Sequence, residues 1–206
     1  MTPPLGMQAS LGGATCYFHP TKIIISHPSV RWGMAKTPFL IRHDITFSNA
    51  AQTINSNSLD LGSYTNLGSS KPEVLRLHKI DFMVTAADGE LPDIAADATA
   101  TVNWCMTTQE NAAALTLASD DAFVAGASLS YRNTDSGGAR QPSQGIEQNI
   151  LPQSYLDGYV IAVPSLFFTG FVDADFDEDV VVSFVLQCTT EAMSKSNAVS
   201  LAISQQ

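Results

Sequence analysis

The chain has 206 residues, 45% of them hydrophobic and 15% charged, and twenty Asp and Glu outnumber ten Lys and Arg to give a net charge of −10. The apolar residues suffice for a sizeable core, and the low charged fraction predicts a surface of Ser, Thr, Asn and Gln, or one covered by neighbours. The sequence holds no run of Lys or Arg, which argues against a free-standing nucleic-acid-binding protein.

The N-terminal part is predicted to be an extended arm. Prolines and glycines break up residues 1–18, and no periodic pattern occurs there. A short strand is expected at residues 21–26, bounded on each side by a His-Pro pair, because proline cannot donate to a sheet ladder. We expect residues 19–206 to form one β-sandwich domain.

Strand patterns dominate the rest of the chain. Alternation of apolar and polar residues, or continuous β-branched runs, mark the clearest strands. In residues 74–84 the apolar positions change phase, from Leu75 and Leu77 to Ile80, Phe82 and Val84, as a β-bulge would produce. The predicted strands are 39–47, 74–84, 100–106, 159–163 and 179–188, with shorter ones at 59–61, 122–124 and 128–131.

Two segments complete the predicted architecture. Residues 107–110 have the spacing of a helix capping box and precede an Ala-rich stretch that ends at Leu117, so one short helix is expected there. Residues 199–203 alternate in polarity and are predicted to be the last strand. The fold class is therefore all-β, an antiparallel two-sheet β-sandwich of jelly-roll type with at most one short helix. The apolar stretches are interrupted well before ~18 residues, so no transmembrane segment is predicted.

The sequence holds no motif of a known catalytic site. Its four histidines form no His-Glu-x-x-His pattern, and neither a nucleophile elbow nor a phosphate-binding glycine loop is present. Cys16, Cys105 and Cys188 are widely separated, and the latter two, lying within apolar strands, are predicted to be buried reduced thiols. We therefore expect no catalytic residues and no enzyme activity.

An acidic hinge, residues 173–179, is the candidate metal site. Asp173, Asp175 and Asp177 recur at every second residue, as at the start of a calcium loop. The pattern then departs from an EF-hand, because Glu178 replaces the turn glycine and Phe184 replaces the bidentate glutamate. The three carboxylates could hold a hard cation such as calcium, and no other cofactor is expected. The alternative is a solvated turn whose charges protect neighbouring strand edges.

Aromatic residues allow a second interpretation, a carbohydrate- or receptor-binding module. Tyr17, Phe18, Trp32, Trp104 and Tyr155 could contribute to a sugar platform, although most lie at core spacing within strands. A further pair, at positions 167 and 168, follows a proline and could form a contact patch on another subunit or a sugar.

In outline, residues 74–82, 159–163 and 179–186, with the extended arm, resemble single jelly-roll capsid proteins of tailless icosahedral viruses. This resemblance implies a structural virion protein, made in the host cytoplasm, that self-assembles as a homo-oligomer, with other capsid proteins as further possible partners. Residues 1–21 contain no Lys or Arg, unlike the Arg-rich arms of many capsid proteins that touch the genome. Direct sequence-specific nucleic-acid binding is therefore not expected.

Overall fold

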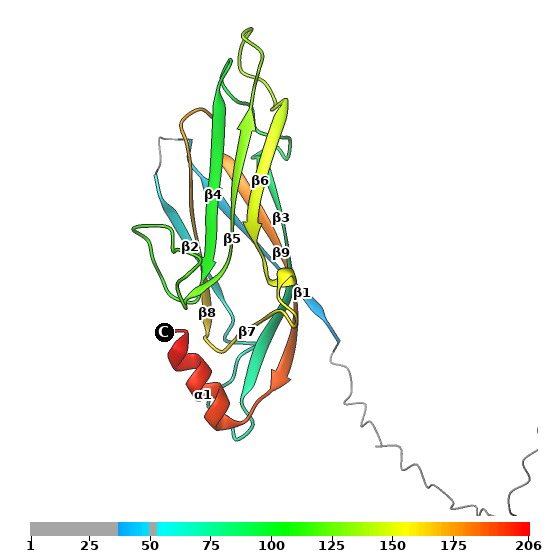
Figure 1. Ribbon diagram of the computed structural model, residues 1–206. Helices are drawn as coiled ribbons and strands as arrows, with labels where there is room; N and C mark the ends of the chain where they lie inside the picture. Colours follow the sequence, from blue (N-terminus) through cyan, green and yellow to red (C-terminus); the bar gives the residue numbers. More distant parts are fainter. Residues whose placement is uncertain (1–36, 50–52) are drawn as a thin grey trace, which may run out of the picture. The chain divides into compact units, whose positions relative to one another are not determined.

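The structure is a computed structural model that describes residues 37–49 and 53–206, and its elements are shown in Figure 1. The predicted arm at residues 1–18 and the predicted strand at residues 21–26 lie outside the described residues, as do Cys16, His19 and His27. The elements are β1 Phe39–Phe47, β2 Asn55–Asp60, β3 Glu73–Ala86, β4 Thr99–Thr107, β5 Phe123–Arg132, β6 Gln144–Ile150, a 3-10 turn Pro152–Ser154, β7 Tyr159–Ile161, β8 Ser165–Val172, β9 Val180–Ala192 and α1 Lys195–Ser204.

The strands form two antiparallel sheets. One sheet has the order β1-β9-β3-β7 and the other has the order β2-β8-β4-β5-β6. With β6 set aside, the pairing is nested, because β1 pairs with β9, β2 with β8, β3 with β7, and β4 with β5. Nested pairing is what a long antiparallel ribbon gives when it is wound into two layers. The prediction of an all-β, two-sheet antiparallel sandwich is confirmed.

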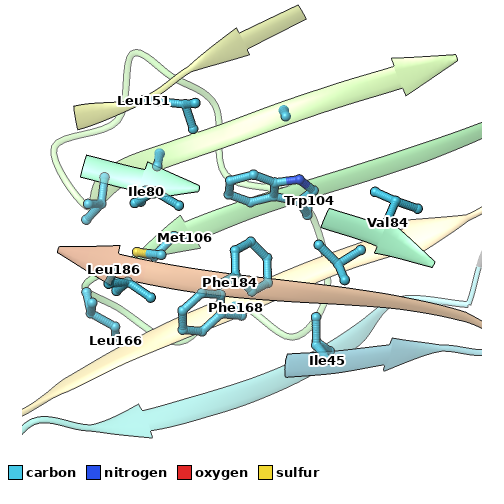
Figure 2. Packing of buried hydrophobic residues seen from close by; sticks show 14 of the residues in the cluster. Ile45, Ile80, Val84, Trp104, Met106, Leu151, Leu166, Phe168, Phe184 and Leu186 are labelled. Carbon is cyan, nitrogen blue, oxygen red and sulfur yellow. The ribbon is translucent and has the colours of Figure 1, made fainter. Parts of the chain in front are cut away.

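A row of aromatic rings joins the two sheets through the core (Figure 2). The ring of Phe184 on β9 lies 4.8 Å from the ring of Trp104 on β4 and 4.7 Å from that of Phe168 on β8. The row continues to Phe82, 5.0 Å from Trp104, and to His43, 4.5 Å from Phe168. Each of five strands supplies one ring, from a position on the face of its sheet that meets the opposite sheet.

The predicted bulge in the third strand is confirmed. The register between β3 and β9 shifts between Leu77 and Lys79, which moves the buried positions from Leu77 to Ile80. Gly158, at φ +71°, packs against this bulge, and a Cβ at that position would lie 2.3 Å from the carbonyl oxygen of Leu77. Only glycine fits there, so the bulge fixes where the chain enters β7.

Two predictions are wrong, the strand at residues 199–203 and the helix at residues 107–117. Residues 199–203 belong to helix α1, which begins after Ser194, whose Oγ accepts a hydrogen bond from the backbone N–H of Asn197. Its buried side is made by Ala198 and Ala202, four residues apart, which pack with Val74. This spacing is helical, and the alternating larger residues lie on the exposed or half-exposed sides. Within the described ranges, no helix has the length and apolarity needed to cross a bilayer.

Residues 107–117 do not form the predicted helix. Thr107 is the last residue of β4, and the segment that follows it is irregular. The side-chain oxygen of Asn111 accepts hydrogen bonds from the backbone N–H groups of Ala113 and Ala114, at 3.4 and 3.3 Å. A side chain that takes up these donors offers the backbone an alternative to the helical pattern. The segment instead forms a loop beside β4 and β5.

Candidate assembly surface

The most exposed strand of the sandwich is β6, at the edge of the five-stranded sheet. All seven residues, Gln144–Ile150, are exposed. The strand pairs with β5 from Arg132↔Gln144 to Gly126↔Ile150, and in the described part of the chain no strand pairs with its other side. The outward backbone N–H and C=O groups of such an edge form a template for a further strand.

β6 differs from an ordinary surface strand in the direction of its side chains, because the apolar ones face outward and the charged one faces the core side. Directly paired residues lie on the same face of a sheet. Glu147 is paired with the buried Leu129, so its carboxylate lies on the side of the sheet that elsewhere faces the core. Ile146 is paired with Ser130 and is 69% exposed on the outer face, and Ile150, on the same face, is 42% exposed. The apolar residues of β6 therefore face outward.

An apolar groove lies next to this edge, on the outer face of the sheet. It has a volume of about 410 Å³ and is lined by Leu115, Leu117, Phe123 and Ile150, among others. Gly126 shapes the groove, since a Cβ there would lie 3.1 Å from the ring of Phe123. Leu117 is 74% exposed, so the rim of the groove is apolar as well.

The other sheet edges are protected against pairing. β1 carries the exposed charges Arg42 and Asp44. β2 carries polar residues at five of its six positions and ends in Asp60, and β7 has only three residues. Charges and short length both discourage edge-to-edge pairing. Among the described strands, β6 is thus the edge that combines seven residues, exposed isoleucines and a single charge.

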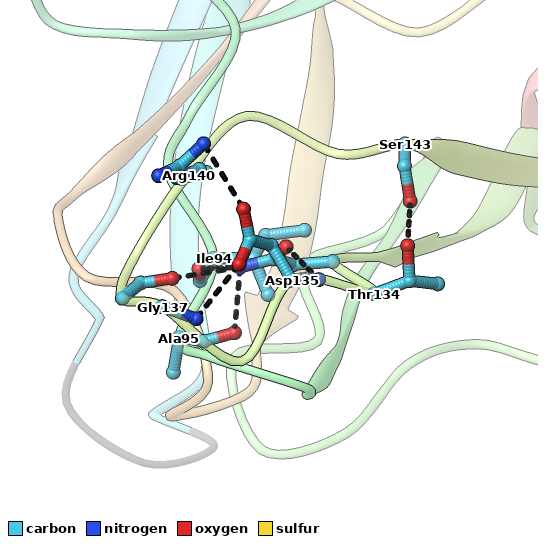
Figure 3. A network of polar contacts seen from close by, with 9 residues as sticks. Ile94, Ala95, Thr134, Asp135, Gly137, Arg140 and Ser143 are labelled. Atoms are coloured by element: carbon cyan, nitrogen blue, oxygen red, sulfur yellow. Dashed lines mark hydrogen bonds and ion pairs between the residues drawn. The ribbon is translucent and has the colours of Figure 1, made fainter.

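A polar network holds the loop that leads into β6 (Figure 3). Asn133, 1% exposed, donates from Nδ2 to the carbonyl oxygens of Ile94, Ala95 and Gly138 at 3.0–3.1 Å. Asp135 pairs with Arg140 at 3.0 Å. The hydroxyls of Thr134 and Ser143 lie 3.1 Å apart just before β6 begins. These contacts hold the loop and fix the start of the edge strand.

The acidic hinge mainly bonds to backbone. Asp173 accepts hydrogen bonds at 2.8 Å from both the N–H and the hydroxyl of Thr101, which joins the hinge to β4. Asp175 and Asp177 are exposed, while Phe176 between them is buried. In residues 37–49 and 53–206, no group of three or more His, Cys, Asp or Glu is arranged to hold a metal ion. A calcium site at Asp173, Asp175 and Asp177 stays a prediction, and a fall in melting temperature on adding chelator would test it.

Among the described residues, the histidines, cysteines and Phe168 that the sequence singled out contribute to packing within the sandwich. Nε2 of His78 lies 2.9 Å from the hydroxyl of Thr189, and His43 lies in the aromatic row, where burial lowers its pKa. Cys105 and Cys188 are buried free thiols, as predicted, and burial raises the pKa of Cys188 to about 12. Phe168 is 1% exposed, so the prediction that it belongs to a contact patch is wrong.

No family model matches the chain, and no curated protein matches it. Three solved structures illustrate what it is similar to. The first is Desmodium yellow mottle tymovirus (12% identity, 94% of this chain and 96% of that chain, TM-score 0.30). The second is turnip yellow mosaic virus at 100 K (13% identity, 76% of this chain and 96% of that chain, TM-score 0.31). The third is the decameric BFDV capsid protein (11% identity, 75% of this chain and 100% of that chain, TM-score 0.16). At these TM-scores the comparisons place the chain in no family.

Proposed function

We propose that this chain is a structural subunit of a virion shell, made in the host cytoplasm, that assembles with copies of itself and has no catalytic role. The observation that carries this proposal is β6, an unprotected edge strand with outward isoleucines. The nested strand pairing supports it, because a two-sheet ribbon of this kind is a jelly roll, an architecture common to viral capsid and lectin domains.

The edge of β6 is suited to a protein partner. An added strand would satisfy the outward backbone groups and cover Ile146 and Ile150 at the same time. Full burial of one isoleucine side chain contributes about 1.5–3 kcal/mol to binding. The gain at each isoleucine of β6 scales with the fraction of its side chain that is still exposed. The Asn133 network holds the loop before the strand, which lowers the ordering cost of binding.

A second candidate, a carbohydrate- or receptor-binding module, is favoured by the groove beside β6. Asn103 and Gln148 line it together with Phe123, so amide groups and an aromatic ring lie in one hollow of about 410 Å³. Binding pockets commonly combine apolar walls with a few polar groups in this way. The two candidates make opposite predictions about the state of the purified chain.

Sedimentation velocity and negative-stain microscopy of the purified chain test the proposal. We expect rings, capsomer-like oligomers or shells, and we expect Ile146→Lys to abolish them. Met83→Lys is the matched control, because Met83 is 60% exposed but lies on β3, inside the other sheet. Equal assembly of both variants would remove β6 from the proposal. A strictly monomeric chain that binds glycans would replace the shell subunit with the second candidate.

A further inference from the structure

The charges of the chain are divided unevenly along its length. Residues 1–36 contain three Lys and Arg and no Asp or Glu, so the remaining 170 residues carry seven Lys and Arg against twenty Asp and Glu, a net charge of −13. Two sandwich domains therefore repel each other, whereas residues 1–36 are attracted to either domain. An edge contact between copies is electrostatically favoured when one side of it comes from residues 1–36.

Within residues 1–36, Thr21–Ser26 has the composition of a strand, with three consecutive isoleucines after Lys22. Strand side chains alternate between faces, so Lys22 and Ile24 would share one face and Ile23 and Ile25 the other. This phase matches β6, where Glu147 lies on one face and Ile146 and Ile150 lie on the other. With Lys22 beside Glu147, Ile23 and Ile25 share the face of Ile146 and Ile150, while Ile24 lies on the face of Glu147.

We propose that Thr21–Ser26 of a second copy adds to the open edge of β6, with Lys22 beside Glu147 and with Ile23 and Ile25 on the face of Ile146. This deepens the proposed function and rests on it. Pairing of two β6 strands with each other is disfavoured, because it brings together two domains of net charge −13 and their Glu147 carboxylates.

Supply by a second copy is favoured over supply by the same chain. β1, which follows residues 1–36, lies at an edge of the four-stranded sheet and contacts β2 and β8, whereas β6 lies at the far edge of the other sheet. A contact within one chain would have to close a loop through residues 27–38, and loop closure costs conformational entropy. A neighbouring copy can present β6 without that cost.

Disulfide trapping with full-length chains tests the contact. In a Cys16→Ser background, Lys22→Cys and Glu147→Cys chains are mixed, oxidised and analysed by mass spectrometry. We expect a mixed dimer in about tenfold higher yield than from Lys22→Cys and Asn57→Cys, as a local effective concentration predicts. Asn57 is the matched control, because it is exposed in the middle of β2, the opposite open edge of the same sheet.

The outcomes separate this inference from the proposed function. Equal trapping at Glu147 and Asn57, or none at either, overturns the β6 contact. A Lys22→Cys, Glu147→Cys double variant that closes only within one chain overturns the second-copy assignment. Sedimentation of the Cys16→Ser parent is measured in parallel. If the parent assembles without trapping at Glu147, only this inference fails, and if the parent does not assemble, the proposed function fails as well.

Discussion

Replacing Phe184 tests whether the aromatic row holds the two sheets together. Phe184 is 1% exposed, and it contacts Trp104 and Phe168, both on the opposite sheet (Figure 2). Truncation of a buried phenylalanine to alanine costs about 3–5 kcal/mol, against a typical total stability of about 5–15 kcal/mol. Phe184→Ala could therefore leave too little folded protein to measure, and Phe184→Leu is the better substitution.

Phe184→Leu keeps most of the apolar volume and removes both ring contacts. Each aromatic pair is worth about 0.5–1.5 kcal/mol beyond its area, so the expected loss is about 1–3 kcal/mol. The free energy of unfolding is measured by urea titration at a concentration where sedimentation shows only monomer, because association stabilises the folded state.

Phe167→Leu is the control for this measurement. Phe167 precedes Phe168 on β8 and is only partly buried, so its replacement is expected to cost less than about 1 kcal/mol. If Phe184→Leu lost no more than the control, the aromatic row would not be the main link between the sheets, and stability would have to come from the aliphatic positions around it.

Three further substitutions follow from the structure. Burial lowers the pKa of His43 from its ordinary 6.5, so the unfolded chain binds the proton more readily than the folded chain. The melting temperature should therefore fall as the pH drops below 6.5. His43→Phe should reduce this dependence of the melting temperature on pH. Gly158→Ala should cost more than about 2 kcal/mol in urea titration, because its Cβ meets the carbonyl of the β3 bulge, whereas Gly89→Ala, also at positive φ but in open space, should cost about 1. Asp173→Asn should lose about 1–3 kcal/mol of unfolding free energy, because it weakens two hydrogen bonds to the start of β4, and Asp175→Asn, at an exposed position, should leave it nearly unchanged.

The sequence predicted those strands whose burial sets their residue pattern. The buried positions of β1 and β9 alternate, and those of β4 alternate as far as Trp104, so the period of two is visible in the chain. The bulge in β3 was also visible, because an extra residue moves the apolar positions by one. These features are local consequences of one face meeting the core.

The predictions failed where burial does not decide the pattern. Helix α1 buries two alanines, Ala198 and Ala202, which give a weaker signal than the exposed Ile203. The Ala-rich segment after β4 was expected to be a helix, but the side chain of Asn111 bonds to its backbone. In the acidic hinge the spacing of the aspartates was visible, but the hydrogen bonds that Asp173 accepts from Thr101 depend on the hinge after β8 meeting strand β4.

The strand at the candidate assembly surface was missed for a reason that bears on its role. β6 buries none of its side chains, so no alternation marks it. Ordering one residue costs about 1–2 kcal/mol of backbone entropy, and a net hydrogen bond returns about 0.5–1.5 kcal/mol, so a strand paired on one side and buried nowhere is near balance. A partner on its open side would double the ladder and cover Ile146 and Ile150 without further ordering of β6. Part of the contacts that stabilise β6 as a strand would then come from a second chain. The local sequence of residues 144–150 alone therefore does not reveal the strand.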